Sequence, residues 1–504
     1  MKNYNIVFQL VKSMSMSEKR QFKLYSNRHV IQKEKQYVIL FDALDRLHEF
    51  DEELLMKQLA ESGISFLFFK ARIHYLYELI LKSLVLFHSG KTTTITLNEW
   101  LTEIEILYHK GNFKSCIKHV YKAQHLARSA DEFLYLLKLL HYEKLVNAHV
   151  SYYNRTDEAV GNEIKTIYKL IENSMLYVDL FNKATHLRIT ISKSRASADI
   201  IKLEKLLSQK LLSKTSYALC TASKIKYYQI HAINNFIQRN NKKELANNEA
   251  VIQLMDSKPN FKSLHLLEYV NTFARILSIT KNTDEAQFYL ALERIRNISI
   301  STDELHYTRI AAQIFIFSYM TEFSFYLQNK YFIKSIEIIP EIEIGMKKYK
   351  DILIASYHVT IIYMLAYYYF CIGDFDNAGN YINRLLNEFE EKNRPDIYNF
   401  AKLLNLFIHL EKGNFTYIKY KQANVRYYFK KQSALHATEN AILDFFSKEK
   451  NYTINFKQSL LILSAELSEM QQDKMERFTL NYFDVNSWIN AKLTGKKTIA
   501  DLFA

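Results

Sequence analysis

A short turn that recurs along the chain restricts the fold most. It reads Lys110-Gly111-Asn112-Phe113 early, Ile372-Gly373-Asp374-Phe375 late, and Lys412-Gly413-Asn414-Phe415 soon after. Each copy lies between two stretches in which apolar residues recur with helical spacing. Because glycine adopts left-handed backbone without a steric cost, the pattern predicts pairs of helices joined by tight turns.

A compact residue follows each of these turns by five positions, which predicts a point where the second helix approaches the first. Further copies are expected where Thr-Asp-Glu-Ala recurs at 156–159 and 283–286, and at 241–246. The predicted anchors are Cys116, Ala159, Ala246, Ala286, Ala378 and Ile418. They are separated by 43, 87, 40, 92 and 40 residues. Since the two long gaps are about twice the short ones, we expect about eight helical hairpins with a period of about 43.

The scarcity of turn residues favours the same interpretation. The 504 residues include nine Gly and three Pro, which is too few for a sheet protein with many loops. A chain of this length exceeds the roughly 250–300 residues of one globular core, so an open-ended stack of repeats is expected. Pro259 and Pro395 fall between predicted units, whereas Pro340 falls inside a predicted helix and is expected to kink or break it.

Two segments of the chain resemble the tetratricopeptide repeat (TPR) family. Leu107–Ile117, with Ala123 further on, and Ala366–Ala378 match the middle of that repeat: an aromatic or aliphatic residue, Gly-Asp/Asn-aromatic, then a small residue. The resemblance implies a right-handed α-solenoid. The period here exceeds 34 and the leading Trp-x-x-Leu-Gly is missing, so longer helices are expected.

A second resemblance covers the ends of the chain. The segments Leu10–Ser26, Tyr75–Leu84 and Tyr482–Leu493 are similar to uncharacterised full-length TPR-like proteins of the Bacteroidota. This resemblance implies no activity.

The expected fold is therefore all-α in three parts. Residues 1–95 form a small helical N-terminal domain, 96–450 form the TPR-like hairpins, and 451–504 form capping helices in which Trp488 packs over the last hairpin. In the first part, Ser15 and Glu18 form a capping box. Helices are expected there at Glu18–Tyr25, Gln36–Leu47, Asp51–Leu59 and Phe66–Phe87.

Membrane insertion and nucleotide binding each have one candidate segment. Ile352–Ile372 carries no Asp, Glu, Lys or Arg and is long enough to span a bilayer, but its tyrosines are spread along its length, so a buried repeat helix is expected. His88–Thr92 resembles the end of a phosphate-binding loop. It lacks the first glycine and follows a helix, so a helix end and a linker are expected instead. The N-terminus lacks the features of a signal peptide.

The sequence predicts no enzyme, no cofactor and no metal site. It contains none of the common catalytic motifs, and its three cysteines lie far apart, which fits a reducing cytoplasm. His358, on an apolar helix, is expected to be a core residue with a hydrogen-bond partner. The acidic pairs Asp157-Glu158 and Asp284-Glu285 are expected to begin helices, where negative charge is favourable.

A net charge of +14 leaves two interpretations open: lysines that solvate helix faces, or a basic surface for an acidic partner. The strongest basic segment is Tyr417–Lys431, in which cations alternate with aromatic rings and no acid occurs. Met1–Lys35 is a second basic region. The candidate contacts of the first segment are Lys419, Lys421, Arg426, Lys430 and Lys431.

The function expected from the sequence is that of a non-enzymatic scaffold in the cytoplasm. A peptide or a helix of a partner protein would lie on the concave face, which the first helices of the hairpins line. The alternative is a nucleic-acid-binding or regulatory protein that uses 417–431 and the basic N-terminus.

Overall fold

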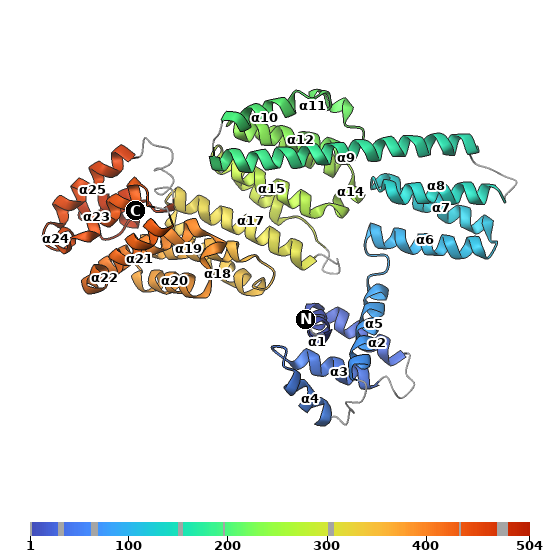
Figure 1. Ribbon diagram of the computed structural model, residues 1–504, viewed down its shortest axis with the longest axis horizontal. Helices are drawn as coiled ribbons and strands as arrows, with labels where there is room; N and C mark the ends of the chain where they lie inside the picture. The colour runs from blue at the N-terminus through green and yellow to red at the C-terminus, as the bar shows by residue number, and fades with distance from the viewer. Residues whose placement is uncertain are drawn as a thin grey trace. The chain divides into compact units, whose positions relative to one another are not determined.

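The computed structural model describes residues 3–28, 35–61, 69–149, 155–194, 197–300, 307–432, 435–470 and 482–503. Throughout these ranges the chain is all-α, as expected, and they contain no strand (Figure 1). Helices that follow one another in the chain pack in sequential pairs along much of its length. The contacts divide the chain into two compact units, 1–240 with 249–269 and 300–307, and 241–248 with 270–299 and 308–504.

The first unit begins with a bundle of five helices around a common core. The predicted capping box is confirmed: the Ser15 N–H donates to Glu18 Oε2 at 2.6 Å, and the Glu18 N–H donates to Ser15 Oγ at 3.2 Å. The four predicted helices are present, although 66–68 lie outside the described residues. The five are α1 (Asn3–Ser13), α2 (Met16–Arg28), α3 (Lys35–Arg46), α4 (Glu52–Glu61) and α5 (Phe69–Phe87).

The segment after α5 that resembles a phosphate-binding loop, His88–Thr92, is the end of a helix and a linker. Gly90 has φ +71, and Thr92 caps the next helix by accepting from the Ile95 N–H at 3.2 Å. His88 Nε2 lies 2.7 Å from Glu18 Oε1, and Lys91 Nζ lies 3.5 Å from the centre of the Phe87 ring. These side chains are thus engaged in local packing.

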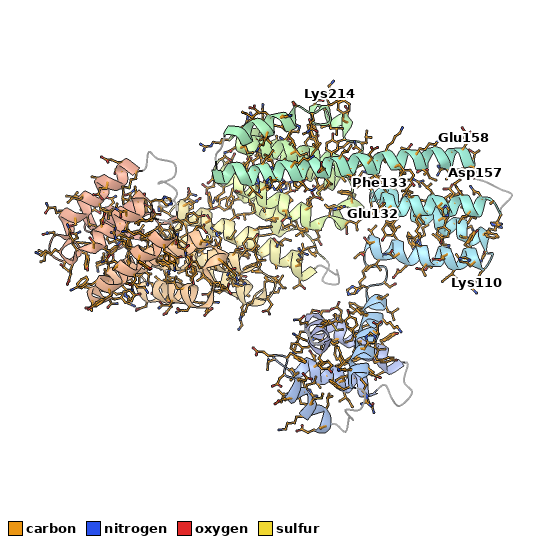
Figure 2. The ribbon with its side chains drawn as sticks, in the orientation of Figure 1. Lys110, Glu132, Phe133, Asp157, Glu158 and Lys214 are labelled. Carbon is orange, nitrogen blue, oxygen red and sulfur yellow. The ribbon has the colours of Figure 1, made fainter. Side chains whose placement is uncertain are left out.

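The remainder of the first unit is built from helices that reverse direction at each turn. The first three of these helices lie side by side. Figure 2 shows Lys110 at one end of them and Glu132 and Phe133 at the other end, and the next helix begins at Asp157 and Glu158, back at the Lys110 end. These helices are α6 (Thr93–His109), α7 (Phe113–Ser129), α8 (Phe133–Asn147), α9 (Asp157–Ser194), α10 (Ser197–Leu207), α11 (Lys210–Ser213), α12 (Thr221–Ile237) and α14 (Pro259–Leu264). Residues of α13 (Asn241–Asp256) and α15 (Leu266–Thr280) belong to both units.

The second unit has one continuous core, with members from Ala312 to Ile499. Near its C-terminal end the Trp488 ring lies 4.8 Å from that of Phe407, and its indole N–H donates to Glu411 Oε1 at 2.6 Å. Its helices are α16 (Glu285–Arg296), α17 (Tyr307–Gln328), α18 (Phe332–Lys348), α19 (Ala355–Ile372), α20 (Phe375–Glu388), α21 (Pro395–Glu411), α22 (Phe415–Lys431), α23 (Ala437–Ser447), α24 (Glu449–Tyr452), α25 (Phe456–Met470) and α27 (Val485–Leu493). The three-part division expected from the sequence stays a prediction.

The recurring turn has the left-handed geometry that the glycines predict. The φ angles are +72 at Gly111, +86 at Gly373 and +68 at Gly413. At the first copy the Gly111 N–H donates to the Tyr108 carbonyl at 2.9 Å, and the Asn112 N–H to the Leu107 carbonyl at 3.0 Å. This pair of hydrogen bonds satisfies carbonyls that the end of a helix would leave without partners. Both other copies repeat it.

Three further copies of the turn carry a residue other than glycine at the left-handed position. These are Asp131 (φ +55), Arg239 (φ +57) and Lys330 (φ +62), with the same two backbone hydrogen bonds. At Asp131 the side chain is also tied down, since its carboxylate accepts from the Thr221 N–H and from Lys258 Nζ, each at 2.8 Å. The turn is therefore defined by its hydrogen bonds, and glycine is only its easiest occupant.

The buried anchor of each second helix lies three residues after the helix begins. Cys116, Ala378 and Ile418 are at this place and are buried, but Ala159, Ala246 and Ala286 are exposed, so those three predicted anchors are wrong. The Thr-Asp-Glu-Ala pattern marks the start of a helix: Thr156 Oγ1 accepts from the Ala159 N–H, and Asp284 accepts from the Gln287 N–H. The buried residues at the equivalent place are Val160, Glu244 and Phe288, followed by Ser335 and Ser459.

The corrected anchors restore a regular spacing. From Cys116 through Val160 to Ser459 they are separated by 44, 84, 44, 47, 43, 40 and 41 residues. The gap of 84 is two periods. The spacing thus continues into α25, which the sequence assigns to a terminal cap. A helical repeat accounts for both the spacing and the sequential packing.

All three prolines and most of the apolar segment Ile352–Ile372 lie in helices. Pro259 and Pro395 each occupy the first turn of a helix, where the missing N–H is not needed. Pro340 does not break its helix, because α18 continues through it with Pro340 on the exposed side. Residues 355–372 of the apolar segment form α19, whose side chains are mostly buried.

A different helix is long and apolar enough to cross a membrane. Among the described residues this is Thr308–Gln328, and 56% of its most apolar stretch is buried within the protein. A core helix passes the same test of length and composition, so this single helix is weak evidence for a membrane span.

Two glycines inside helices give opposite expectations on substitution by alanine. A Cβ on Gly345 of α18 would lie 2.0 Å from Cε2 of Phe315, whereas one on Gly379 of α20 would meet only Ile408 Cγ2 at 3.8 Å. Gly345→Ala should lower the free energy of unfolding by about 1–3 kcal/mol through overpacking. Gly379→Ala should raise it by up to ~1 kcal/mol through helix propensity. Urea unfolding followed by circular dichroism compares them, and a midpoint for Gly345→Ala equal to wild type would contradict the close approach.

Candidate functional site

Helix α18 presents an apolar stripe to solvent. Its inward face is formed by Phe332, Ser335, Ile339, Ile342 and Gly345, which pack into the core of the second unit. On the opposite face Ile333 is 81% exposed, Ile336 55% and Ile344 60%. With the exposed Pro340 these residues have spacings of three, four and four, which place them on one side of a helix. We call Ile333, Ile336, Pro340 and Ile344 the α18 stripe.

The α18 stripe was not predicted from the sequence. Apolar residues occupy almost every face of this helix, and a helix that is apolar all round is usually read as buried. The structure shows that one face of α18 packs into the core and that the face with the α18 stripe is exposed to solvent. Pro340 is tolerated because the carbonyl of Ile336, which loses its helical hydrogen bond, belongs to the exposed face, where water can replace that bond.

The basic-aromatic segment forms α22, with its two faces clearly separated. Ile418, Val425 and Phe429 face the core and are buried. Tyr420 and Tyr427 are 70% and 72% exposed and lie seven positions apart, so their rings occupy one outer face. We call these two rings, with the exposed cations Lys419, Lys430 and Lys431, the α22 surface.

Two of the predicted cations of α22 are engaged within the protein. Arg426 donates to Asn440 Oδ1 at 2.7 Å and to Asp444 Oδ1 at 2.6 Å, so its charge is neutralised by α23. Lys421 is partly buried, with Nζ 5.8 Å from the centre of the Tyr417 ring. The remaining aromatic residue, Tyr428, lies under Lys402, whose Nζ is 4.4 Å from the ring centre.

In the second basic region predicted from the sequence, at the N-terminus, two lysines are paired with acids. Lys19 Nζ lies 2.6 Å from Asp45 Oδ1, and Lys23 Nζ lies 2.7 Å from Asp42 Oδ1. Lys12 donates to the backbone carbonyl of Asp45 at 2.6 Å. Within 3–28, these lysines hold α1 and α2 against α3. Residues 29–34 lie outside the described residues.

A cavity of about 530 Å³ contains His358, the histidine that the sequence places in the core. His358 is buried, its Nε2 lies 3.2 Å from the Lys350 carbonyl oxygen, and its ring stacks on Phe389. Burial lowers the pKa of His358, although the Lys350 carbonyl opposes this effect. The prediction of a buried histidine with a hydrogen-bond partner is confirmed.

The cysteines and acids form no reactive cluster in the part of the chain that the structure describes. Within it, no group of three or more His, Cys, Asp or Glu could hold a metal ion. All three cysteines are buried and free, and burial raises the pKa of Cys371 to about 12 and that of Cys116 above its usual value. A buried thiol with a raised pKa is a poor nucleophile at neutral pH.

Comparisons with protein-family models, with curated proteins and with solved structures give no match to this chain. The features of the molecule that indicate a function are therefore its two exposed surfaces and its cavities.

Proposed function

We propose that the protein is a scaffold of TPR-like hairpins, wound as a right-handed solenoid, that binds an amphipathic helix of a partner protein along the α18 stripe. The α18 stripe is the observation that carries this proposal. The repeated turn and the anchor spacing of 40–47 residues per unit support the solenoid. The sequence placed the binding surface on first helices, whereas α18 is the second helix of its pair.

The chemistry of the α18 stripe fits a helix better than an extended peptide. Its members recur at helical spacing along one face, so an amphipathic partner helix with apolar residues at i, i+3 and i+7 would contact all of them. Fully burying an isoleucine side chain contributes about 1.5–3 kcal/mol. Three such side chains contribute about 4.5–9 kcal/mol before the cost of association, so micromolar affinity also requires burial of the apolar residues of the partner helix.

The test compares two double variants with the wild-type protein in affinity capture from the native cell. Ile333→Asp with Ile344→Asp places charges in the α18 stripe, and Ile454→Asp with Ile462→Asp changes two equally exposed isoleucines elsewhere. All four side chains are exposed, so both variants should fold. We expect the wild-type protein to capture a partner protein. The amount of partner recovered should fall more than tenfold with the first variant and stay unchanged with the second.

Equal recovery by both variants, or no partner for the wild type, would contradict the proposal. Circular dichroism of both variants provides the control for folding.

The α22 surface supports a second candidate function, binding of single-stranded nucleic acid. Two exposed rings on one face can stack on bases, and the exposed cations Lys419, Lys430 and Lys431 beside them can contact phosphates. Rings that served only packing would be buried, as Phe429 is.

Fluorescence anisotropy with a single-stranded RNA oligomer at 50–200 mM salt tests this candidate. Tyr420→Ala with Tyr427→Ala should weaken binding at least tenfold, since stacking contributes about 1–3 kcal/mol per base. Lys430→Gln with Lys431→Gln should lower the slope of log K against log salt by about 1–2. Lys334→Gln, an exposed lysine on α18, is the matched control. Absence of binding at 50 mM salt would exclude this candidate.

A further inference from the structure

A second cavity, of about 740 Å³, lies within the second unit. Residues of α17, α19 and α21 line it, together with Lys281, Lys330 and the segment 482–484. Its size is in the range of sites for small molecules. The wall combines the hydroxyl-bearing side chains of Thr321, Ser324 and Thr360 with apolar ones such as Met364. We call this the Lys281 cavity.

Cations outnumber carboxylates on the wall of the Lys281 cavity. Its cations are Lys281, Lys330 and Arg394, and Asp484 is its carboxylate. Asp484 is matched with Lys330, since Nζ and Oδ2 are 2.6 Å apart. Burial works against ionisation of Asp484, but Lys330 and hydrogen bonds from Ser487 keep its pKa below the usual range.

Arg394 is also neutralised. Its guanidinium donates to both carboxylate oxygens of Asp396, at 2.8 and 2.6 Å, and also to Thr360 Oγ1 at 2.9 Å. This two-point contact is the strongest type of ion pair in proteins. Two of the three cations of the wall are therefore balanced by acids of the protein.

Lys281 is not balanced in this way. Its ammonium donates to Ser324 Oγ at 3.1 Å, and among the described residues no carboxylate lies within ion-pair distance of it. Burial lowers the pKa of Lys281, because the charged ammonium loses part of its hydration. A partly desolvated cation that faces a cavity is the natural partner of an anion.

Lys330, on the wall of the Lys281 cavity, occupies the left-handed position of a turn. Other copies of the turn have glycine at this position, and two have Asp131 and Arg239. Here a lysine occupies it, and its side chain reaches Asp484 on the cavity wall.

We propose that the Lys281 cavity binds a small organic anion, whose phosphate or carboxylate group pairs with the Lys281 ammonium. Ser324, whose hydroxyl accepts from Lys281, and Thr321 line the same cavity and could donate to this group, and Tyr363 and Tyr482 line the space for the rest of the ligand. This site differs from the α18 stripe and the α22 surface in residues and in ligand, so it can be tested separately from both.

Isothermal titration calorimetry and thermal-shift measurements on the full-length protein test the proposal with three probes. Inorganic phosphate and glycerol 3-phosphate represent phosphates, and citrate represents carboxylates. We expect at least one probe to bind saturably and to raise Tm, and the preferred probe identifies the anionic group.

Two variants locate the site. Lys281→Met keeps the length of the side chain and removes its charge, and should weaken binding at least tenfold. Lys334→Met removes an exposed lysine of the same unit and should leave the affinity within twofold of wild type. Absence of binding of all three probes to the wild type, or equal affinity of Lys281→Met and wild type, would overturn the proposal. Because the wild-type titration comes first, the test does not depend on the folding of a variant.

Discussion

The pair of backbone hydrogen bonds found at six turns between consecutive helices is the interaction on which the rest of the structure depends. It forces one residue into the left-handed region and satisfies carbonyls that the helix end leaves open. The chain then begins a second helix two residues later, most often with phenylalanine, as at Phe113, Phe133, Phe332, Phe375 and Phe415. The third residue after that start packs inward, so one local rule fixes both the turn and the register of the following helix.

This rule leaves the outward faces of the helices free to differ. The inward face of α18 and that of α22 both join the core of the second unit, yet one outer face is apolar and the other is basic and aromatic. In a repeat each unit buries its core against its neighbours, and function is added on exposed surfaces. Turn residues can differ in the same way: Lys330, at the left-handed position of its turn, forms part of the wall of the Lys281 cavity.

Much of the repeat could be predicted from the sequence because glycine marks the left-handed residue at Gly111, Gly373 and Gly413. The copy at Asp131 was missed, because hydrogen bonds and not residue type define the turn. The anchors Ala159, Ala246 and Ala286 were wrong for a related reason: alanine after an acidic pair marks the first turn of a helix and says nothing of its inward face.

The surfaces were predicted less well than the repeat. The exposure of Tyr420 and Tyr427 on α22 was one of two open alternatives, and only packing could decide between them. The Lys281 cavity joins residues that are about two hundred positions apart in sequence, from Ser278 to Asp484. No local pattern in the sequence brings such residues together.

Two substitutions test most directly whether the copies of the turn share one geometry: one introduces glycine at Arg239, and the other removes it at Gly413. Arg239 is exposed with φ +57, and a Cβ at Gly413, with φ +68, would meet nothing within 4 Å. If both are the same left-handed turn, Arg239→Gly should raise the free energy of unfolding by about 0.5–1 kcal/mol and Gly413→Ala should lower it by about 1 kcal/mol. Urea unfolding of each variant against wild type measures this. A loss of stability in Arg239→Gly would contradict the account.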